Sequence, residues 1–340
     1  MYVDNGEKSL LVTGGTGFIG RHLVAALLEQ NAKLRVLVRR GSSVPPTWGR
    51  RVRLCYGDLE DPESLIPVCQ GVDSLFHAAG FAHAWSKSSP QMVDSHWRVN
   101  ALGTRHLLEA AGRNGVRHFV FLSSVKAMGE GGERCIDEDW PLLPQTPYGK
   151  AKRAAEQWVI EMGQQYGMQV VNLRLAMVYG PGVGGNLQRM VNGIRAGWFP
   201  PLPEVGNRRS MVHVVDVVQA ALLAVANPVA NQRTYIITDG QTYTSREVYD
   251  LIYHGVKAKQ HAWAVPFGVL RMIAGIADIA GWLRGKPIGF DSATLNKLLD
   301  WACYRSDKIQ RELGYRPSRT LVDSLAEILR GDFSAGELKG

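Results

Sequence analysis

A glycine-rich turn between a short strand and a helix is the feature that most constrains the fold of this chain. An apolar run at residues 9–13 is followed at once by Gly14-Gly15-Thr16-Gly17-Phe18-Ile19-Gly20, and residues 21–30 then place apolar side chains along one helical face. Gly14 permits a tight turn, Gly17 lets the backbone approach a pyrophosphate, and Gly20 lets the helix pack on the strand. The helix N-terminus adds free N–H groups and a positive dipole end. This order of elements predicts a dinucleotide site that includes Phe18 and Ile19.

Strand and helix patterns alternate through the first half of the chain, which predicts an α/β fold with a doubly wound parallel sheet. After Gly180 glycines and prolines become frequent and the pattern loosens. We therefore predict a nucleotide-binding domain at residues 1–178 and a smaller substrate-binding lobe at 179–340, with 206–240 returning to the first domain. Further strands are expected at 34–38, 52–56, 74–79, 117–122 and 169–175, and helices at 61–70, 91–114, 147–166, 216–227, 245–254 and 321–329.

Composition narrows the classes of protein. The 340 residues carry a net charge of +8, which suits anionic small molecules, but no basic run is interleaved with aromatic residues, so nucleic-acid binding is not indicated. The N-terminus is polar, so no signal peptide is expected. The cysteines show neither metal spacing nor a disulfide rhythm, which predicts reduced thiols in a cytoplasmic protein. They are Cys55, Cys69, Cys135 and Cys303.

One apolar, glycine-rich stretch could be taken for a membrane-spanning helix. Residues 267–283 are short for a transmembrane helix and are interrupted by Arg271 and Asp278, whose charges would be costly in lipid. We expect a buried or lid-forming helix pair here, and contact with a membrane surface is the less favoured alternative.

Tyr148 and Lys152 lie four residues apart after a proline, so a helix would place them on one face, one turn apart. A phenol is a poor base because its ordinary pKa is near ~10, and a neighbouring ammonium would lower that pKa. Ser124 ends an apolar strand pattern, at the edge where open α/β sheets bind ligands. The three residues predict the acid/base half of a hydride transfer, with Tyr148 exchanging the proton and Ser124 bonded to the same substrate oxygen.

Taken together, these residues resemble the extended short-chain dehydrogenase/reductase family, in its branch of nucleotide-sugar epimerases and dehydratases. The resemblance covers nearly the whole chain, and the order and spacing of the motifs make it specific. The motifs are TGGTGFIG at 13–20, GDL at 57–59, HAAG at 77–80, VNALGT at 99–104, LSS at 122–124, Tyr148 with Lys152, YGPG at 179–182, RSMVHVVD at 209–216 and ELGYRP at 312–317.

The resemblance implies a Rossmann-type sheet, an NAD(P) cofactor and roles for particular residues. Lys152 would hold the nicotinamide ribose hydroxyls, and Asn186 and Arg209 would contact a substrate diphosphate, onto whose oxygens a guanidinium can fork. The remaining positions implied are Asp58 and Leu59 at the adenine, Ala78 and Ala79 beside the nicotinamide ribose, and Asn100 as the structural asparagine of the catalytic core.

Three departures from the family pattern restrict the activity. Met177 stands where an asparagine often touches the sugar, which weakens the assignment to a standard galactose-type epimerase. A late substrate arginine is hard to place near Lys297. Val125 and Lys126 follow Ser124 where sugar 4,6-dehydratases have acidic residues, so dehydration is disfavoured.

The end of the second strand bears on the cofactor. An NAD site usually has an acidic residue there, about ~20 residues past the glycine turn, to hold the ribose 2′-hydroxyl. This chain has Arg39 and Arg40, then Ser42 and Ser43, and no carboxylate, which suits a 2′-phosphate unless both arginines point to water. We predict NADP(H), with NAD(H) still open. Because a reductase takes a new NADPH each turnover and an epimerase retains its cofactor, this favours a 4-keto nucleotide-sugar reductase over a sugar 4-epimerase.

The sequence also bears on two other functions and on a partner. Arg209 favours a diphosphate substrate and so disfavours a steroid- or flavonoid-type dehydrogenase. The intact Ser124, Tyr148 and Lys152 disfavour a catalytically inactive protein that only senses NADP. Residues 123–130 resemble a segment of bacterial surface-polysaccharide reductases, which implies a UDP-linked N-acetylated deoxysugar. The resemblance also implies a homodimer through the helices at 91–114 and 147–166. Residues that could supply its face, although a role in the core is equally compatible with their spacing, are Leu102, His106, Ala110, Ala155 and Val159.

Overall fold

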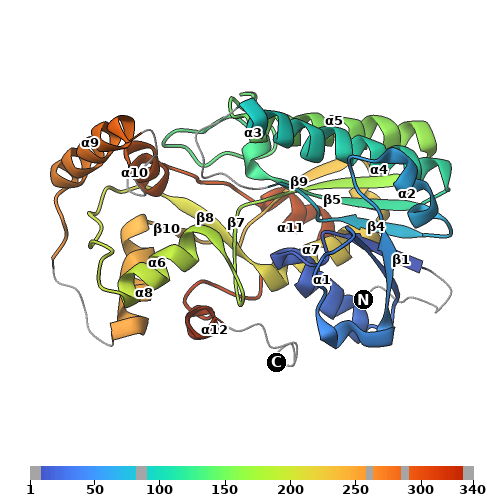
Figure 1. The fold of residues 1–340 in the computed structure, drawn as a ribbon, viewed down its shortest axis with the longest axis horizontal. Coiled ribbons are helices and arrows are strands. Elements are labelled where there is room, and N and C mark those ends of the chain that lie inside the picture. Colours follow the sequence, from blue (N-terminus) through green and yellow to red (C-terminus); the bar gives the residue numbers. More distant parts are fainter. Residues whose placement is uncertain (1–8, 82–89, 258–262, 285–290, 332–340) are drawn as a thin grey trace.

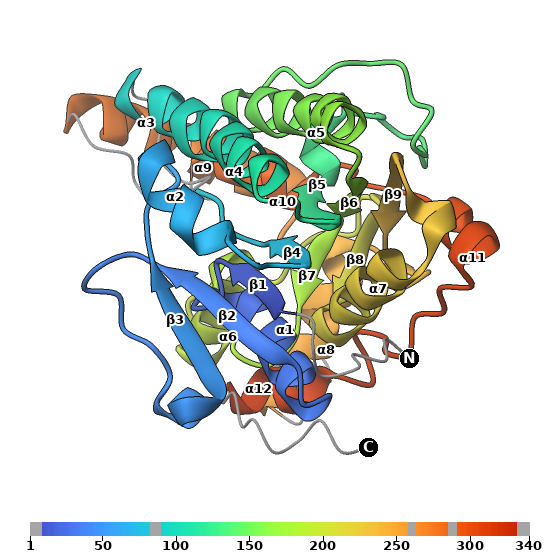
Figure 2. The same cartoon turned by 90° about the vertical axis from the view of Figure 1, so that its right-hand side faces the viewer.

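The computed structural model describes residues 9–81, 90–257, 263–284 and 291–331. Seven parallel strands form its main sheet, in the order β3-β2-β1-β4-β5-β6-β9 (Figures 1 and 2). Because the order reverses at β1, the sheet is doubly wound, and the predicted α/β Rossmann-type fold is confirmed. Its strands are β1 (Ser9–Thr13), β2 (Lys33–Val38), β3 (Val52–Tyr56), β4 (Ser74–His77), β5 (His118–Ser124), β6 (Gln169–Leu175) and β9 (Arg233–Ile237).

Helices cover both faces of this sheet, as Figure 2 shows. Leu10 and Val12 of β1 point into the core beneath α1 (Phe18–Glu29) and α7 (Val214–Ala226), whereas Leu11 points to the opposite core. Alternate side chains of a strand face opposite sides, so burial on both sides explains why β1 is a continuous apolar run. The opposite core lies under α2 (Pro62–Cys69), α4 (Gly103–Arg113) and α5 (Pro147–Tyr166).

The helix expected at residues 91–114 is not one regular helix. It comprises α3 (Pro90–Ser95), the π-helical segment η2 (His96–Leu102) and α4. In this stretch the Thr104 hydroxyl donates to the Asn100 carbonyl at 2.8 Å and also contacts the ring of His77 at 2.9 Å. A side chain that bonds into the backbone ladder perturbs a regular α-helix, which the apolar spacing alone did not predict.

The second half of the chain adds a lobe at one end of the main sheet (Figure 1). Its small sheet has the order β10-β8-β7. Its elements are β7 (Met177–Tyr179), β8 (Arg209–His213), β10 (Thr242–Tyr243), α6 (Gly185–Arg195), α8 (Ser245–Lys257), α9 (Phe267–Leu283), α10 (Ser292–Leu299) and α12 (Leu325–Arg330). Elsewhere lie η1 (Pro46–Arg51), η3 (Val125–Ala127), η4 (Pro228–Ala230) and α11 (Asp307–Leu313).

The apolar stretch at 267–283 forms one helix, α9, and its apolar side chains are largely exposed, so the prediction of a buried or lid-forming helix pair is wrong. Leu270 and Ala274 pack into the lobe core, but Met272 is 60% exposed and Ile279 is 63% exposed. Apolar composition indicates that a helix can be buried, whereas actual burial depends on what the rest of the chain places over it.

The prediction of four reduced thiols is wrong for one pair. Cys135 and Cys303 form a disulfide, with their Cα atoms 4.4 Å apart, although they are 168 residues apart in sequence. Next to it, Ile136 and Tyr304 pair as an isolated β-bridge, which brings the two segments together. Such a distant pair has no recognisable spacing, so only the tertiary structure could show it. Cys55 and Cys69 are free.

Three residues suggested for a dimer face are part of the core instead. Ala110, Ala155 and Val159 are buried between α4, α5 and the main sheet. His106 is half-buried, and its ring lies 2.9 Å from the Leu59 carbonyl; Leu102 is also half-buried. For these three residues the core role is therefore confirmed, and the homodimer itself stays a prediction.

Candidate active site

The glycine turn leaves its backbone open to a phosphate group. Gly14 has a φ of 71°, and a Cβ there would lie 2.5 Å from the Ala79 nitrogen. A Cβ on Gly20 would lie 2.1 Å from the Gly14 carbonyl oxygen. Gly17 is the N-cap of α1 and no side chain caps this end, so the first N–H groups of the helix are available to a group of negative charge.

A cavity lies over this turn and contains most of the predicted cofactor residues. Phe18 packs against the lobe core, Ile19 packs against the core under α1, and Gly20 is part of the turn itself. Arg40 lines an adjoining cavity together with Arg39 and Ser42. This shape and these donors fit a dinucleotide. The predicted residues that line the main cavity are Gly14, Gly17, Arg39, Asp58, Leu59, Ala78 and Ala79.

Tyr148 and Ser124 meet at the carboxyl end of β5. Pro147 starts α5, and the Thr146 hydroxyl caps it by accepting the N–H of Gly149. Ser124 accepts the N–H of Lys126 at 3.2 Å and hydrogen-bonds Tyr148. Burial raises the pKa of Tyr148, and the bond with Ser124 opposes this rise. Lys152 is not among the groups that act on this pKa, so the expected lowering by Lys152 is wrong: desolvation of the phenol dominates.

Lys152 lies deep in the same site. Its Nζ donates to the Leu122 carbonyl at 2.9 Å and lies 4.3 Å from the ring centroid of Phe121. Burial lowers the pKa of Lys152 to about 8, against the opposing effect of Glu156. A Cβ on Gly80, which lines the dinucleotide cavity, would lie 3.9 Å from this Nζ. The ammonium thus lies at the boundary between the acid/base pair and the cavity.

Asn100 supports this boundary from η2. Its Oδ1 accepts the Phe81 N–H at 2.7 Å, and its Nδ2 donates to the Phe81 carbonyl at 2.9 Å. His96 also belongs to η2, and its ring centroid lies 5.5 Å from that of Tyr148. The sequence reasoning missed His96, although its position four residues before Asn100 was a usable signal. π-helical turns are frequent at functional sites.

A buried ion pair beneath the site was also missed. Glu156 lies one turn after Lys152 and binds Arg174 of β6, with an Nη2–Oε2 distance of 2.8 Å. Ser123 donates to the other oxygen of Glu156 at 2.6 Å. These contacts fix β5, β6 and α5 relative to one another, so they position Ser124 and Lys152 indirectly.

A second cavity lies in the lobe and has a largely apolar lining. It includes the predicted Asn186 and Arg209, and also Met177 and Lys297. Arg209 Nη1 donates to the carbonyls of Lys297 and Asp300, both at 3.0 Å, and so caps the end of α10. Burial lowers the pKa of Arg209. The apolar residues of this cavity are Met177, Leu187, Met190, Trp198, Phe199, Val248 and Leu298.

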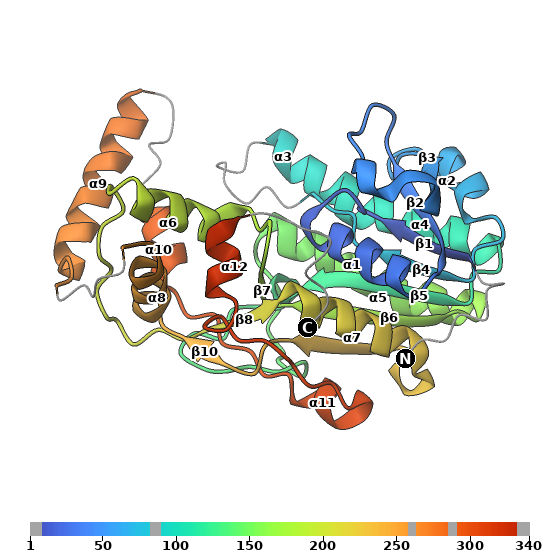
Figure 3. The ribbon, with the colours of Figure 1, turned by 90° about the horizontal axis from the view of Figure 1, so that it is seen from below.

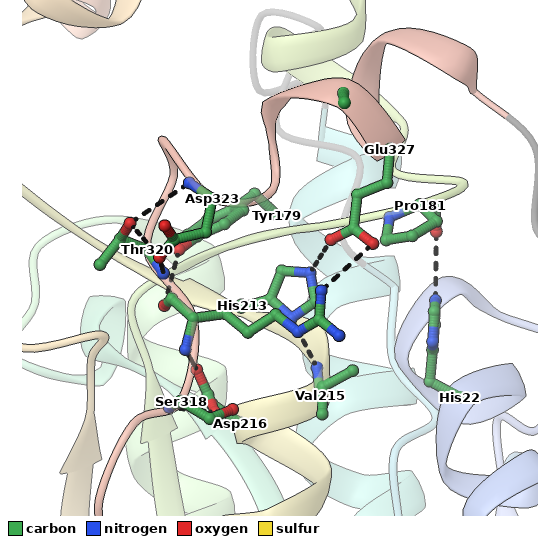
Figure 4. A network of polar contacts seen from close by, with 12 residues as sticks. His22, Tyr179, Pro181, His213, Val215, Asp216, Ser318, Thr320, Asp323 and Glu327 are labelled. Atoms are coloured by element: carbon green, nitrogen blue, oxygen red, sulfur yellow. Dashed lines mark hydrogen bonds and ion pairs between the residues drawn. The ribbon is translucent and has the colours of Figure 1, made fainter. Parts of the chain in front are cut away.

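A polar network joins the lobe to the nucleotide-binding part (Figure 4). The ring of His22 on α1 contacts the Pro181 carbonyl at 3.1 Å, and burial lowers the pKa of His22 to about 4, so this ring is neutral. His213 lies 2.9 Å from Glu327 of α12. Asp216 of α7 accepts the N–H of Ser318 at 2.8 Å. The C-terminal segment therefore ties α12 and α7 together.

Two kinds of feature are absent from the described ranges. These ranges contain no cluster of three or more His, Cys, Asp or Glu side chains arranged for a metal ion. No helix among them combines the length and the hydropathy that a bilayer span requires.

Comparison with known proteins agrees with this geometry. The model of the "NAD dependent epimerase/dehydratase family" matches residues 10–238. A Methylococcus capsulatus protein named sterol demethylase protein B is 29% identical, over 91% of this chain and 94% of its own. A Vibrio cholerae UDP-glucose 4-epimerase is 27% identical, over 86% and 90%.

A solved structure adds the same likeness in three dimensions. The Thermus thermophilus UDP-glucose 4-epimerase, in complex with NAD, superposes with a TM-score of 0.73 at 25% identity, over 95% of this chain and 98% of its own. Because the family model spans more than half of the chain, the protein belongs to the NAD dependent epimerase/dehydratase family, an α/β family of NAD(P)-dependent enzymes.

Proposed function

We propose that this enzyme is an NADPH-dependent reductase that acts on the C4 keto group of a nucleotide-diphosphate sugar. The observation that carries the proposal is the end of β2, where Arg39, Arg40 and Ser42 line one cavity. Residues 38–43 contain no carboxylate that could hold a ribose 2′-hydroxyl instead. Two guanidinium groups and a hydroxyl suit a 2′-phosphate, and NADPH in a cell is a reductant drawn from a pool.

The residues around Tyr148 suit a reduction. A bound nicotinamide would supply the hydride that the carbonyl carbon accepts. Tyr148 donates its phenolic proton to the carbonyl oxygen, and the Ser124 hydroxyl holds that oxygen in place. Burial raises the pKa of Tyr148, so the phenol is protonated at neutral pH, which is the form that a reduction requires. Lys152 is placed to hold the ribose and to return the phenol to its protonated state.

The lobe cavity supports a diphosphate substrate. Asn186, Arg209 and Lys297 give it an amide and two cationic side chains. Arg209 Nη1 is held by carbonyl oxygens, which orients the rest of the guanidinium without cost at binding. The substrate arginine that the family has late in the chain is hard to place in this sequence near Lys297. We propose that Lys297 takes part in phosphate binding instead. A UDP-linked N-acetylated deoxysugar is our proposed substrate.

The test begins with mass spectrometry of the dinucleotide released from the denatured protein. Initial rates of ketone reduction are then measured with NADPH and NADH on an enzymatically prepared UDP-4-keto-6-deoxy-N-acetylhexosamine. We expect NADPH to be preferred, and the double variant Arg39→Ala/Arg40→Ala to lose that preference while an Arg50→Ala control keeps it. Stoichiometric NAD retained by the protein would overturn the proposal in favour of a 4-epimerase.

A second candidate is the reduction of a ketone on an apolar, sterol-like substrate. The lining of the lobe cavity, with Met177, Trp198 and Phe199, favours it, and one relative is named for a sterol reaction. If the enzyme reduces a 3-ketosteroid and UDP does not inhibit that reaction, this candidate is supported over the nucleotide-diphosphate sugar.

The arrangement of the whole protein belongs to the same proposal. We place the cofactor mainly in residues 1–178 and the substrate mainly in 179–340, with 206–240 shared between them. A cytoplasmic homodimer remains a prediction. The disulfide between Cys135 and Cys303 would have to persist there against cellular reductants.

A further inference from the structure

The two sides of α9 have the same apolar character but opposite surroundings. Leu270, Ala274 and Gly281 are buried on the side that packs against the lobe. At about 100° per residue, five further large apolar side chains fall within an arc of about 120°, whose centre lies about 140° from that of the buried side. They are Val269, Met272, Ile273, Ile276 and Ile279, and all are exposed to solvent.

This arc, which we call the α9 face, lies at an extremity of the molecule. Figures 1 and 3 place α9 at the opposite end from the main sheet, and no other described element lies outward of it. Met272 and Ile276 are each 60% exposed, and Ile279 is 63% exposed. A contiguous apolar face of this kind marks a binding surface. A flat partner could reach it without meeting the rest of the described chain.

The charge of the surrounding sequence indicates what that partner is. Residues 257–297 contain six Lys or Arg and two Asp, so this segment carries +4 of the chain's net charge of +8. Arg271 and Arg284 are exposed on and just after α9. A second copy of the chain would bring a like-charged surface against this one, which is unfavourable. Anionic lipid headgroups are complementary to it.

We propose that the α9 face docks this enzyme on an anionic membrane surface. The helix has 17 residues, so it is about 25 Å long, and Asp278 interrupts its apolar sequence. It is therefore too short and too polar to span a bilayer, in agreement with the absence of a spanning helix in the described ranges. It lies in the plane of the interface, with the α9 face at the boundary between headgroups and acyl chains and the basic residues beside phosphates.

Docking would place the lobe cavity close to the membrane. α10 packs against α9, and its residues Thr294, Lys297 and Leu298 line that cavity. Arg209 bonds to the carbonyls at the end of the same helix. A helix held at the interface would therefore hold one wall of the cavity there, while the main sheet stays in water.

The experiment is co-sedimentation of the full chain with unilamellar vesicles. One set contains phosphatidylcholine alone, and the other also contains phosphatidylglycerol. We expect binding to the anionic vesicles only, weakening as the salt concentration rises. The double variant Ile276→Glu/Ile279→Glu should lower the bound fraction roughly tenfold. Val229→Glu, which changes an equally exposed side chain on η4, should bind like the unmodified protein.

Two outcomes would overturn the proposal. The first is equal sedimentation with both vesicle types, or none with either. The second would come from light scattering of the protein and the double variant without lipid, which measures the molar mass and so detects self-association. If Ile276→Glu/Ile279→Glu lowers the molar mass and leaves vesicle binding unchanged, the α9 face is an interface between copies of the chain. Unchanged mass together with lost vesicle binding supports membrane docking.

Discussion

The nucleotide-binding part and the outer end of the lobe use apolar side chains in contrasting ways. In the first, Leu10, Leu11 and Val12 of β1 are fully buried because helices cover both faces of the sheet. In the second, Ile276 and Ile279 of α9 have equally apolar side chains that stay in contact with solvent. The apolar surface of the first part is thus covered by elements of the same chain, whereas that of α9 is left uncovered by the described chain, which agrees with our proposal that it binds a partner.

The largest expected effect concerns chemistry at the junction of the two parts. Tyr148→Phe removes the proton donor, and we expect kcat to fall about 10³-fold with the free energy of unfolding changed by less than about 1 kcal/mol. Tyr243→Phe in the lobe is the matched control, because its hydroxyl donates to Asp239 at 3.0 Å. It should lose about 1 kcal/mol of stability and retain kcat. Steady-state kinetics and urea unfolding distinguish the two, and a Tyr148→Phe enzyme with normal kcat would refute the catalytic role.

Glycine-to-alanine changes in one helix of each part should have opposite signs. In Gly20→Ala the new Cβ would meet the Gly14 carbonyl, and we expect a loss of about 3 kcal/mol and of dinucleotide binding. In Gly275→Ala of α9 nothing lies within 4 Å, so alanine's better helix propensity should add up to about 1 kcal/mol. Urea unfolding and fluorescence of bound NADPH measure both. If both variants lose a similar free energy of unfolding, α9 is packed more tightly than the structure shows.

Breaking the disulfide should weaken the link between the two parts. Cys135→Ser/Cys303→Ser is expected to lower the free energy of unfolding by about 3 kcal/mol, the usual contribution of a native disulfide. Thermal unfolding with and without dithiothreitol gives the check. The reductant should lower the Tm of the unmodified protein and leave that of the double variant unchanged; equal Tm shifts in both would contradict the assignment.

Mild acid should distinguish a buried histidine of the main sheet from an exposed one of the lobe. Burial lowers the pKa of His77 to about 3, whereas the unfolded chain has about 6.5, so the unfolded state binds more protons between these values. Stability should therefore fall as the pH drops below 6.5, by about 2 kcal/mol between pH 7 and pH 5. The His77→Gln variant should lose this part of the pH dependence of stability. The variant His254→Gln, which changes an exposed residue of α8, should keep it. If the free energy of unfolding of His77→Gln falls with pH as steeply as that of the unmodified protein, the prediction is contradicted.

The same contrast explains what the sequence could predict. Local patterns sufficed for α5 and β6, whose bounds agree with the structure, because a proline start and a continuous apolar run are local signals. They also brought Ser124, Tyr148 and Lys152 to one site. They could not show that burial raises the Tyr148 pKa, since desolvation depends on the whole fold. For the same reason they missed the exposure of α9.

The bond between Cys135 and Cys303 also has a topological consequence. It closes residues 135–303 into one covalent ring, and that ring contains Tyr148, Lys152 and every residue that lines the lobe cavity. A protease cut at any single point within the ring would leave both fragments joined. On a gel without reductant such a nicked enzyme would still migrate as a single species, and reductant would separate it into two. The wall of the lobe cavity thus stays attached to Tyr148 and Lys152 even when the main chain between them is broken.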